Sequence, residues 1–259
     1  MEAQVPGRSS YLMTGVMCAC VLAFGICLIL PALGPRRGVS RHLQSLNNLK
    51  NLVLAVHNYS SANEGTLPSS HWEHSPPMSW RAQVLPYLDR ADMHREYDPS
   101  LAFSEGHNSE LSRISLKVFD SPEGDHLTPN SAGWARSDYG MVSGPGTVQP
   151  DDRSVTLDEI SEGDGLGQTL MIVECSGLQL GWAEPRDPRV DRETIGIEQL
   201  TKVRQKSKSL ISTYNRGTAP VAFADGAARS ISNKIDPKLL AALCTINGGE
   251  KISPEDYQH

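Results

Sequence analysis

The stretches YLMTGVMCACVLAFGICLILPAL, residues 11–33, and SRHLQSLNNLKNLVLAVHNYSSA, residues 40–62, decide the fold of this chain. The first carries no charged residue and exceeds the roughly 20 apolar residues that cross the hydrocarbon core of a bilayer. A cleaved secretory signal is the alternative, but its apolar region spans only about 7–15 residues. We therefore predict a transmembrane anchor at residues 11–33, preceded by a polar tail at residues 1–10.

The second stretch has the pattern of an amphipathic helix. Its apolar residues recur at three- and four-residue steps, at Leu43, Leu46, Leu49, Val53 and Val56. Gly34-Pro35 is expected to interrupt the chain after the anchor, and Ser40 is a candidate N-cap. Gly65 and Pro68 are expected to stop the helix. The sequence thus predicts a spine helix at residues 40–62, whose apolar stripe packs on a sheet.

Strand patterns gather in the second half of the chain. Four short stretches predict strands, at residues 139–142, 170–175, 221–223 and 227–231. The stretch LMIVEC at residues 170–175 lies between Gly167 and Gly177 and is the candidate for a central strand. Asp225-Gly226 joins the last two stretches and is a strong signal for a hairpin turn. An antiparallel sheet is therefore expected.

The rest of the body, residues 34–259, is predicted to be one globular domain with shorter helices and many loops. Residues 80–97 and 108–118 have helical character, with a break at Pro86, and Asp236-Pro237 precedes a last helix at residues 238–246. Residues 184–192, EPRDPRVDR, are expected to form an irregular loop. The predicted fold class is α+β: a transmembrane helix continued by an amphipathic helix packed on an antiparallel sheet, with long loops.

Charge and cysteine content limit the function classes. The net charge of −6 argues against a nucleic-acid surface, which is usually strongly basic. Cys18, Cys20 and Cys27 are read as small apolar residues of the anchor. Cys175 and Cys244 could form one disulfide if the body is exported, but their spacing does not decide this.

No catalytic, cofactor-binding or metal-binding residues are predicted. His71, Glu73 and His74 form a small cluster that could bind metal, but a solvated loop is the simpler interpretation. A second, acidic stretch is expected to be a solvated face, with a calcium site as the alternative. This stretch lacks the spacing of an EF-hand. Its residues are Asp151, Asp152, Asp158, Glu159, Glu162 and Asp164. His57 is expected to make a core or helix–sheet hydrogen bond, and Glu174 and Trp182 are expected to be structural.

Neither a phosphate-binding loop nor a serine nucleophile is expected. The stretch GDGLG at residues 163–167 lacks the Lys and Ser or Thr of a phosphate-binding loop and precedes a strand. The chain contains no Gly-x-Ser-x-Gly sequence for a nucleophile elbow.

Several motifs together resemble a large bacterial pilin-like family with a domain of unknown function, number fifteen fifty-nine. After the Leu-Pro-Ala that ends the apolar run, they are NNLKNLVLAVHNY at residues 47–59, SWR at 79–81, LPYL at 85–88, YGMVSGPG at 139–146 and WAEPRD at 182–187. Residues 157–174 also resemble a family stretch, and an Asp-Gly followed by a short helix resembles its C-terminal signature. The resemblance runs from about residue 30 to residue 251.

Three features depart from the family pattern. The prepilin peptidase motif is missing, and no acidic residue occurs between Glu2 and Glu64. Asn215 stands where the family has His, and Ser121 lies in a segment where the family often has Cys. In pilins the missing Glu pairs with a neighbouring subunit, so its loss argues against assembly through that contact.

Two features of the sequence predict opposite orientations of the chain in the membrane. Arg36, Arg37 and Arg41 follow the anchor, which on the positive-inside rule keeps the body in the cytoplasm. The family resemblance instead implies an exported body, periplasmic or at the cell surface. We expect a single-pass membrane protein of that second topology.

The expected function is a membrane-anchored, pilin-like or pseudopilin-like surface protein that is not an enzyme and is not processed by the peptidase. The lipid bilayer is its expected partner, with other pilin-like subunits or cell-envelope components as candidates, and neither nucleic acid nor a cofactor is expected. A true pseudopilin of a secretion machine and a membrane-tethered ligand-binding module or enzyme facing the periplasm are the alternatives.

Overall fold

The computed structural model describes residue 17 and residues 35–70, 75–124, 128–202, 205–250 and 252–257. The chain divides into two units, residues 1–41 and 42–259. Apart from Met17, the predicted tail and anchor lie outside the described residues. Within the described ranges, no helix has both the length and the apolar character that crossing a membrane requires.

The long helix α2 spans Pro35–Ala62. The predicted start at Ser40 is wrong, because Ser40 lies inside the helix and is not its N-cap. Proline at the first turn loses no intrahelical hydrogen bond, so Pro35 is compatible with a helix start. The predicted end is confirmed, since Gly65 adopts a φ of 82° just beyond Ala62.

The buried face of α2 differs partly from the predicted stripe. Leu49, Val53 and Val56 are fully buried as expected, and Leu46 is half-buried. The prediction that Leu43 is buried is wrong, because 54% of its surface is exposed. The additional buried residues are Ser45, Leu52, Ala55 and Ser60. At 100° per residue these lie on one arc, whereas Leu43 falls on the opposite side of the helix.

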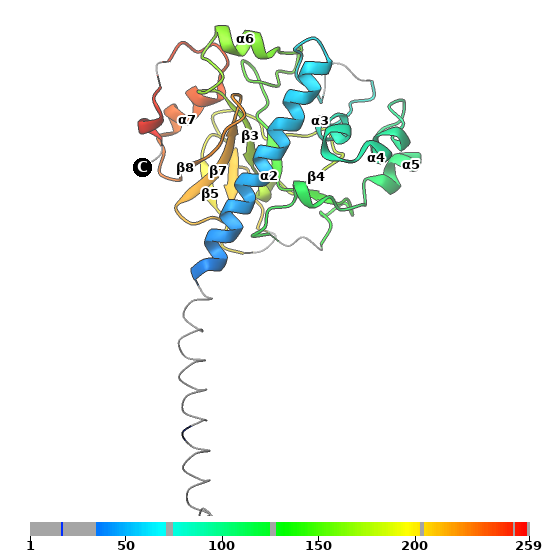
Figure 1. Ribbon diagram of the computed structural model, residues 1–259, viewed down its shortest axis with the longest axis horizontal. Coiled ribbons are helices and arrows are strands. Elements are labelled where there is room, and N and C mark those ends of the chain that lie inside the picture. The colour runs from blue at the N-terminus through cyan, green and yellow to red at the C-terminus, as the bar shows by residue number, and fades with distance from the viewer. Residues whose placement is uncertain are drawn as a thin grey trace, which may run out of the picture. The chain divides into compact units, whose positions relative to one another are not determined.

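A four-stranded antiparallel sheet forms the centre of the body (Figure 1). Its order is β2-β3-β7-β8, with bounds β2 Tyr139–Met141, β3 Leu170–Glu174, β7 Thr218–Phe223 and β8 Ala228–Ser232. All five residues of β3 are buried and it pairs on both sides, which confirms the predicted central strand. The predicted hairpin is also confirmed, since β7 pairs with β8 across Gly226, whose φ is 86°.

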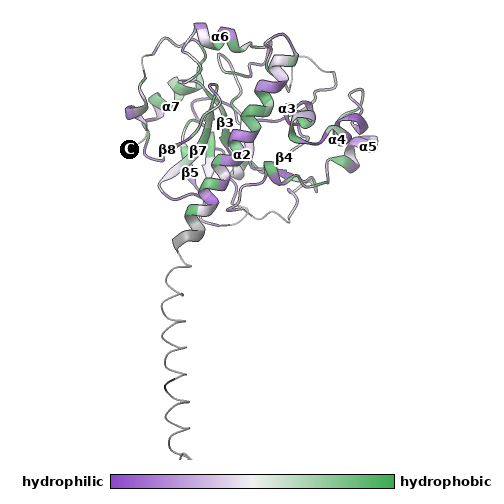
Figure 2. Cartoon of the chain, in the orientation of Figure 1, coloured by the Kyte–Doolittle hydropathy of each residue, from purple (hydrophilic) through white to green (hydrophobic). Residues whose placement is uncertain are grey.

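From His42 onwards α2 packs against this sheet (Figure 1). Hydrophobic residues of α2 and of the sheet strands belong to one continuous core. Two hydrogen bonds tie the layers together: Ser45 Oγ lies 3.0 Å from the hydroxyl of Tyr139, and His57 Nε2 lies 2.9 Å from the carbonyl oxygen of Ala224. The predicted helix-on-sheet arrangement is therefore confirmed, as is the interpretation of His57. Figure 2 shows the apolar residues gathered on the strands and on part of α2.

Two smaller sheets were not predicted. β1 (Arg136–Ser137) pairs antiparallel with β4 (Leu180–Gly181), and β5 (Ile197–Gln199) pairs parallel with β6 (Ile211–Thr213). Strands of two or three residues are too short for an alternating pattern to be recognised.

Short helices complete the described body. They are α3 Trp80–Gln83, η2 Leu85–Leu88, α4 Ala91–Glu96, α5 Gly106–Leu111, η3 Lys117–Phe119, α6 Leu157–Glu162, η4 Ser176–Leu178, α7 Pro237–Cys244 and η5 Pro254–Asp256. The helical region at 80–97 is confirmed as three pieces. The predicted helix at 108–118 is wrong in extent, because α5 ends at Leu111. The last helix is confirmed, with the side chain of Asp236 accepting from the backbone N–H of Lys238.

Candidate functional site

The most deeply buried ion pair joins two sequence motifs that are far apart in the chain. Arg81 on α3 lies with its Nη2 2.7 Å from Oδ1 of Asp187, and neither side chain is exposed to solvent. The same guanidinium donates from Nε and Nη2 to the carbonyl oxygen of Tyr139, at 3.0 and 2.8 Å. The SWR motif is therefore fixed to β2 and to the loop that carries Asp187.

Asp187 is the centre of this network. Besides Arg81, its carboxylate accepts hydrogen bonds from Trp80 Nε1 at 3.0 Å, the backbone N–H of Met141 at 3.1 Å, Gln149 Nε2 at 2.9 Å and Ser70 Oγ at 3.1 Å. Burying a charge is tolerated only when it is paired and hydrogen-bonded, and here both conditions hold. A saturated carboxylate without solvent access is suited to holding the fold together and not to proton transfer.

A second buried acid, Glu174, ends the central strand. Its Oε1 accepts from Ser121 Oγ at 2.9 Å and from Ser176 Oγ at 3.4 Å, and its Oε2 accepts from Asn215 Nδ2 at 3.3 Å. Burial, and secondarily the negative charge of Asp138, raises the pKa of Glu174 to about 8. Glu174 is thus held as a neutral acid in the core at neutral pH.

A hydrogen-bond chain connects Glu174 to α2. Asn215 Oδ1 lies 3.0 Å from His42 Nδ1, and His42 Nε2 lies 2.7 Å from Ser230 Oγ on β8. Ser121 and Asn215, the two positions in the body where the sequence departs from the family pattern, both donate to Glu174. The two departures therefore meet at one buried carboxyl group.

Trp182, the other residue expected to be structural, is also fully buried. Its indole Nε1 donates to the carbonyl oxygen of Ile114 at 3.0 Å, and its ring stacks on Phe119 with centroids 6.3 Å apart. Its own carbonyl oxygen accepts from Ser79 Oγ at 3.0 Å. These contacts link the WAEPRD motif to the SWR motif a second time.

Acidic residues of the stretch at 151–164 have protein partners. Asp151 pairs with Arg189 at 2.6 Å and Glu159 with Arg153 at 2.5 Å. Asp164 accepts from the backbone N–H groups of Gly248 and Gly249, both at 2.7 Å, and from the hydroxyl of Thr245. Within the described residues, no three His, Cys, Asp or Glu side chains are grouped to hold a metal ion. The cluster of His71, Glu73 and His74 lies outside the described residues.

Cys175 and Cys244 are both buried and free, so the disulfide between them is ruled out. Desolvation raises the pKa of the Cys244 thiol to about 12 and raises that of Cys175 as well. Buried thiols of this kind are inert and behave as small apolar residues.

One open cavity of about 570 Å³ lies among the loops. Side chains that line it include Phe103, Asn130, Trp134, Gln179, Lys206 and Lys208. These residues come from several loops, and none of them belongs to one of the sequence motifs. The cavity differs in character from the buried networks around Asp187 and Glu174, because exposed cations and aromatic rings line it.

The fold defines an α+β protein of pilin-like architecture, in which a long N-terminal helix packs on an antiparallel sheet. Residues 36–159 match the model of the family described as "Protein of unknown function (DUF1559)". The recognition made from the sequence motifs is confirmed there; the WAEPRD and Asp-Gly motifs lie beyond the matched range. No curated protein and no solved structure is similar enough to the chain to count as a match.

Proposed function

We propose that this chain is a membrane-anchored, pilin-like or pseudopilin-like structural protein of the periplasm or cell surface. The observation that carries the proposal is the short separation in sequence between α2 and the apolar run. The helix that packs on the sheet begins at Pro35, and the uncharged residues 11–33 end only two positions before it. A body attached in this way to a membrane segment has the outline of a pilin subunit.

A non-enzymatic role is supported by the chemistry of the two buried acids. The carboxylate of Asp187 accepts hydrogen bonds from Arg81 and several other donors. The carboxyl group of Glu174 is buried and hydrogen-bonded to Ser121, Ser176 and Asn215. Catalytic acids need access to substrate and a pKa matched to their task, and these carboxyl groups lack the first. Both instead connect the loops and α3 to the sheet.

The bilayer is the proposed partner, and other pilin-like subunits or envelope components are proposed as further contacts. The absence of an acidic residue from the apolar run argues that any such contact does not use the Glu of pilins. The proposed topology exports the body despite Arg36, Arg37 and Arg41. Because the peptidase motif is missing, we propose that the anchor stays unprocessed.

Retention of the segment before the anchor tests the unprocessed state. We expect mass spectrometry of the full chain, isolated from membranes of expressing cells, to detect peptides from residues that precede Tyr11. A variant in which a Gly-Phe-Thr-Leu-x-Glu motif is introduced before the apolar run serves as a positive control in a host that contains the peptidase. Loss of the preceding residues from the unaltered chain, at the extent seen in that control, would instead support a true pseudopilin.

A further inference from the structure

The cavity has a fixed aromatic wall. The rings of Phe103 and Trp134 meet edge to face, with centroids 5.5 Å apart. The guanidinium of Arg113 lies 4.9 Å from the centroid of the Trp134 ring, at a distance typical of a cation–π contact. Both residues are half-buried and both line the cavity.

Asn130 fixes the loop that carries Trp134. Its Oδ1 accepts from the backbone N–H groups of Ala132 and Trp134, both at 3.0 Å, and its Nδ2 donates to the carbonyl oxygen of Gln179 at 3.3 Å. Gln179 itself is held at a φ of 52°, a left-handed conformation that is uncommon for a residue other than glycine. Two sides of the cavity are therefore preformed.

The loop that carries Lys206 and Lys208 is fixed at Ser207, the residue between them. Ser207 donates from its backbone N–H to the carbonyl oxygen of Gly177 at 3.0 Å and from Oγ to Glu198 at 2.6 Å. A Cβ at position 177 would lie 2.4 Å from Cβ of Ser207, so only glycine permits this approach. The close seating of Ser207 fixes the backbone positions of Lys206 and Lys208 on either side of it.

The charge of the cavity is opposite to that of the chain. Three cations, Arg186, Lys206 and Lys208, line it beside one carboxylate, that of Glu184. Arg186 Nε lies 2.7 Å from Glu184, which neutralises one cation. In the part of the chain that the structure describes, neither lysine ammonium forms an ion pair. Among the residues that line the cavity, two positive charges therefore remain, on a chain of net charge −6.

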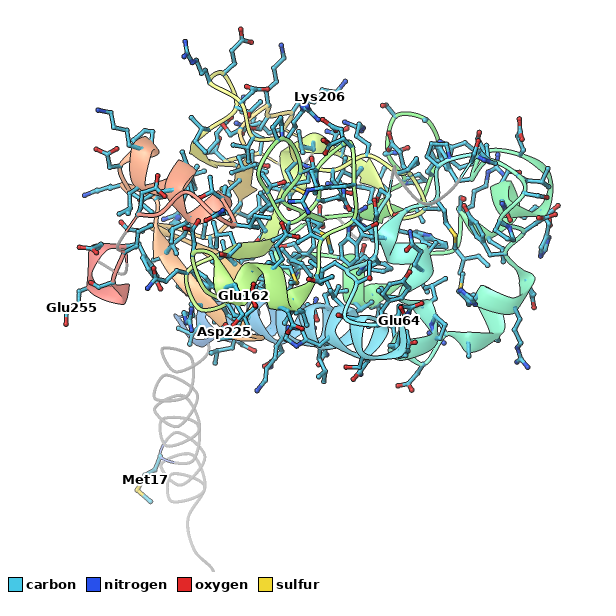
Figure 3. The ribbon with its side chains drawn as sticks, turned by 90° about the horizontal axis from the view of Figure 1, so that it is seen from above. Met17, Glu64, Glu162, Lys206, Asp225 and Glu255 are labelled. Atoms are coloured by element: carbon cyan, nitrogen blue, oxygen red, sulfur yellow. The ribbon has the colours of Figure 1, made fainter. Side chains whose placement is uncertain are left out.

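No residue of the spine helix α2 is among those that line the cavity. Figure 3 shows Lys206 on the side of the body away from α2. Lys206 and Lys208 are exposed, so an incoming ligand meets them first, whereas the rings of Phe103 and Trp134 are partly covered. A local positive potential of this kind raises the concentration of anions at the opening.

We propose that this cavity binds an anionic sugar: a ring compound that bears a carboxylate or a phosphate group. Its anionic group contacts Lys206 and Lys208, and its ring lies against Trp134 and Phe103. The volume falls within the ordinary range for small-molecule sites, which is about 300–1,000 Å³. Charge-assisted hydrogen bonds from two ammonium groups supply the affinity, and the aromatic wall orients the ring. The inference stands on the cavity alone and does not depend on the membrane anchor.

The test is titration calorimetry of the full chain in a non-ionic detergent with three probes: glucuronate, glucose 6-phosphate and neutral glucose. We expect at least one anionic probe to bind at least about tenfold more tightly than glucose, since glucose has no charged group to accept hydrogen bonds from the two ammonium groups. Raising the salt concentration is expected to weaken that binding. The stronger of the two anions identifies whether a carboxylate or a phosphate is preferred.

Two double variants localise the binding. Lys206→Gln with Lys208→Gln is expected to weaken the anion at least about tenfold, whereas the matched pair Lys234→Gln with Lys238→Gln, outside the cavity lining, leaves it unchanged. Both pairs alter solvent-accessible lysines, and equal melting temperatures show that the fold is kept. Failure of both anions to bind, equal binding of glucose, or full retention of binding by the first double variant would overturn the proposal.

Discussion

Arg81→Met is expected to lower the free energy of unfolding by about 3–5 kcal/mol, because it leaves the buried carboxylate of Asp187 without its cation. Methionine preserves most of the volume, so the loss comes from the charge and from the hydrogen bonds to Tyr139. The measurement is urea unfolding of the full chain in a non-ionic detergent, followed by tryptophan fluorescence.

An exposed ion pair supplies the matched control for this variant. Arg153 pairs with Glu159 at 2.5 Å, but the two side chains are 44% and 39% exposed. Arg153→Met is expected to cost less than about 1 kcal/mol, as is usual for surface pairs. If both variants lose the same small amount, Asp187 is not the structural centre described above.

Glu174→Gln is expected to remove a large pH dependence of stability. The pKa of Glu174 is about 8 in the folded chain and near 4.5 when exposed, so below pH 4.5 the acid is protonated in both states. As the pH rises from 4.5 to 8, the unfolded chain gives up this proton while the folded chain retains it. Stability from this group therefore falls with rising pH, by on the order of 4 kcal/mol.

Comparison of unfolding curves at pH 5 and pH 8 isolates this contribution. Glutamine keeps the size and the polarity of a neutral acid, so the variant should be more stable than the unaltered chain at pH 8 and similar to it at pH 5. Glu162→Gln, at an exposed residue of α6, should leave the pH dependence as it is. An unchanged slope in Glu174→Gln would mean that this group is ionised in the folded chain.

The fold was predictable where a periodic pattern coincides with a turn signal. α2 and β3 have strong apolar patterns, and the hairpin at Asp225-Gly226 has a turn signal between two strands. Leu43 shows the limit of such patterns, because three- and four-residue steps drift around a helix and only tertiary packing selects the buried arc. The strands of two or three residues carry no pattern of their own.

The site was predictable only in part. Glu174 and Trp182 were recognised as structural, but their partners were not, because the hydrogen bonds cross long separations in sequence. Asp187 lies in a stretch that is rich in charge and proline, and these features correctly predict an irregular loop. They do not indicate that one acid of the loop is buried and fully hydrogen-bonded. The cavity around Trp134 and Lys206 depends on several loops meeting, which a single sequence does not encode locally.

The exported, anchored body is the central claim, and protease accessibility tests it most directly. Cells that express the full chain are converted to spheroplasts and treated with a protease that does not cross the inner membrane. We expect the body to be digested in intact spheroplasts while a cytoplasmic marker protein survives. A body that is protected in spheroplasts and digested only after lysis would place it in the cytoplasm, as Arg36, Arg37 and Arg41 suggest, and would contradict the proposed function.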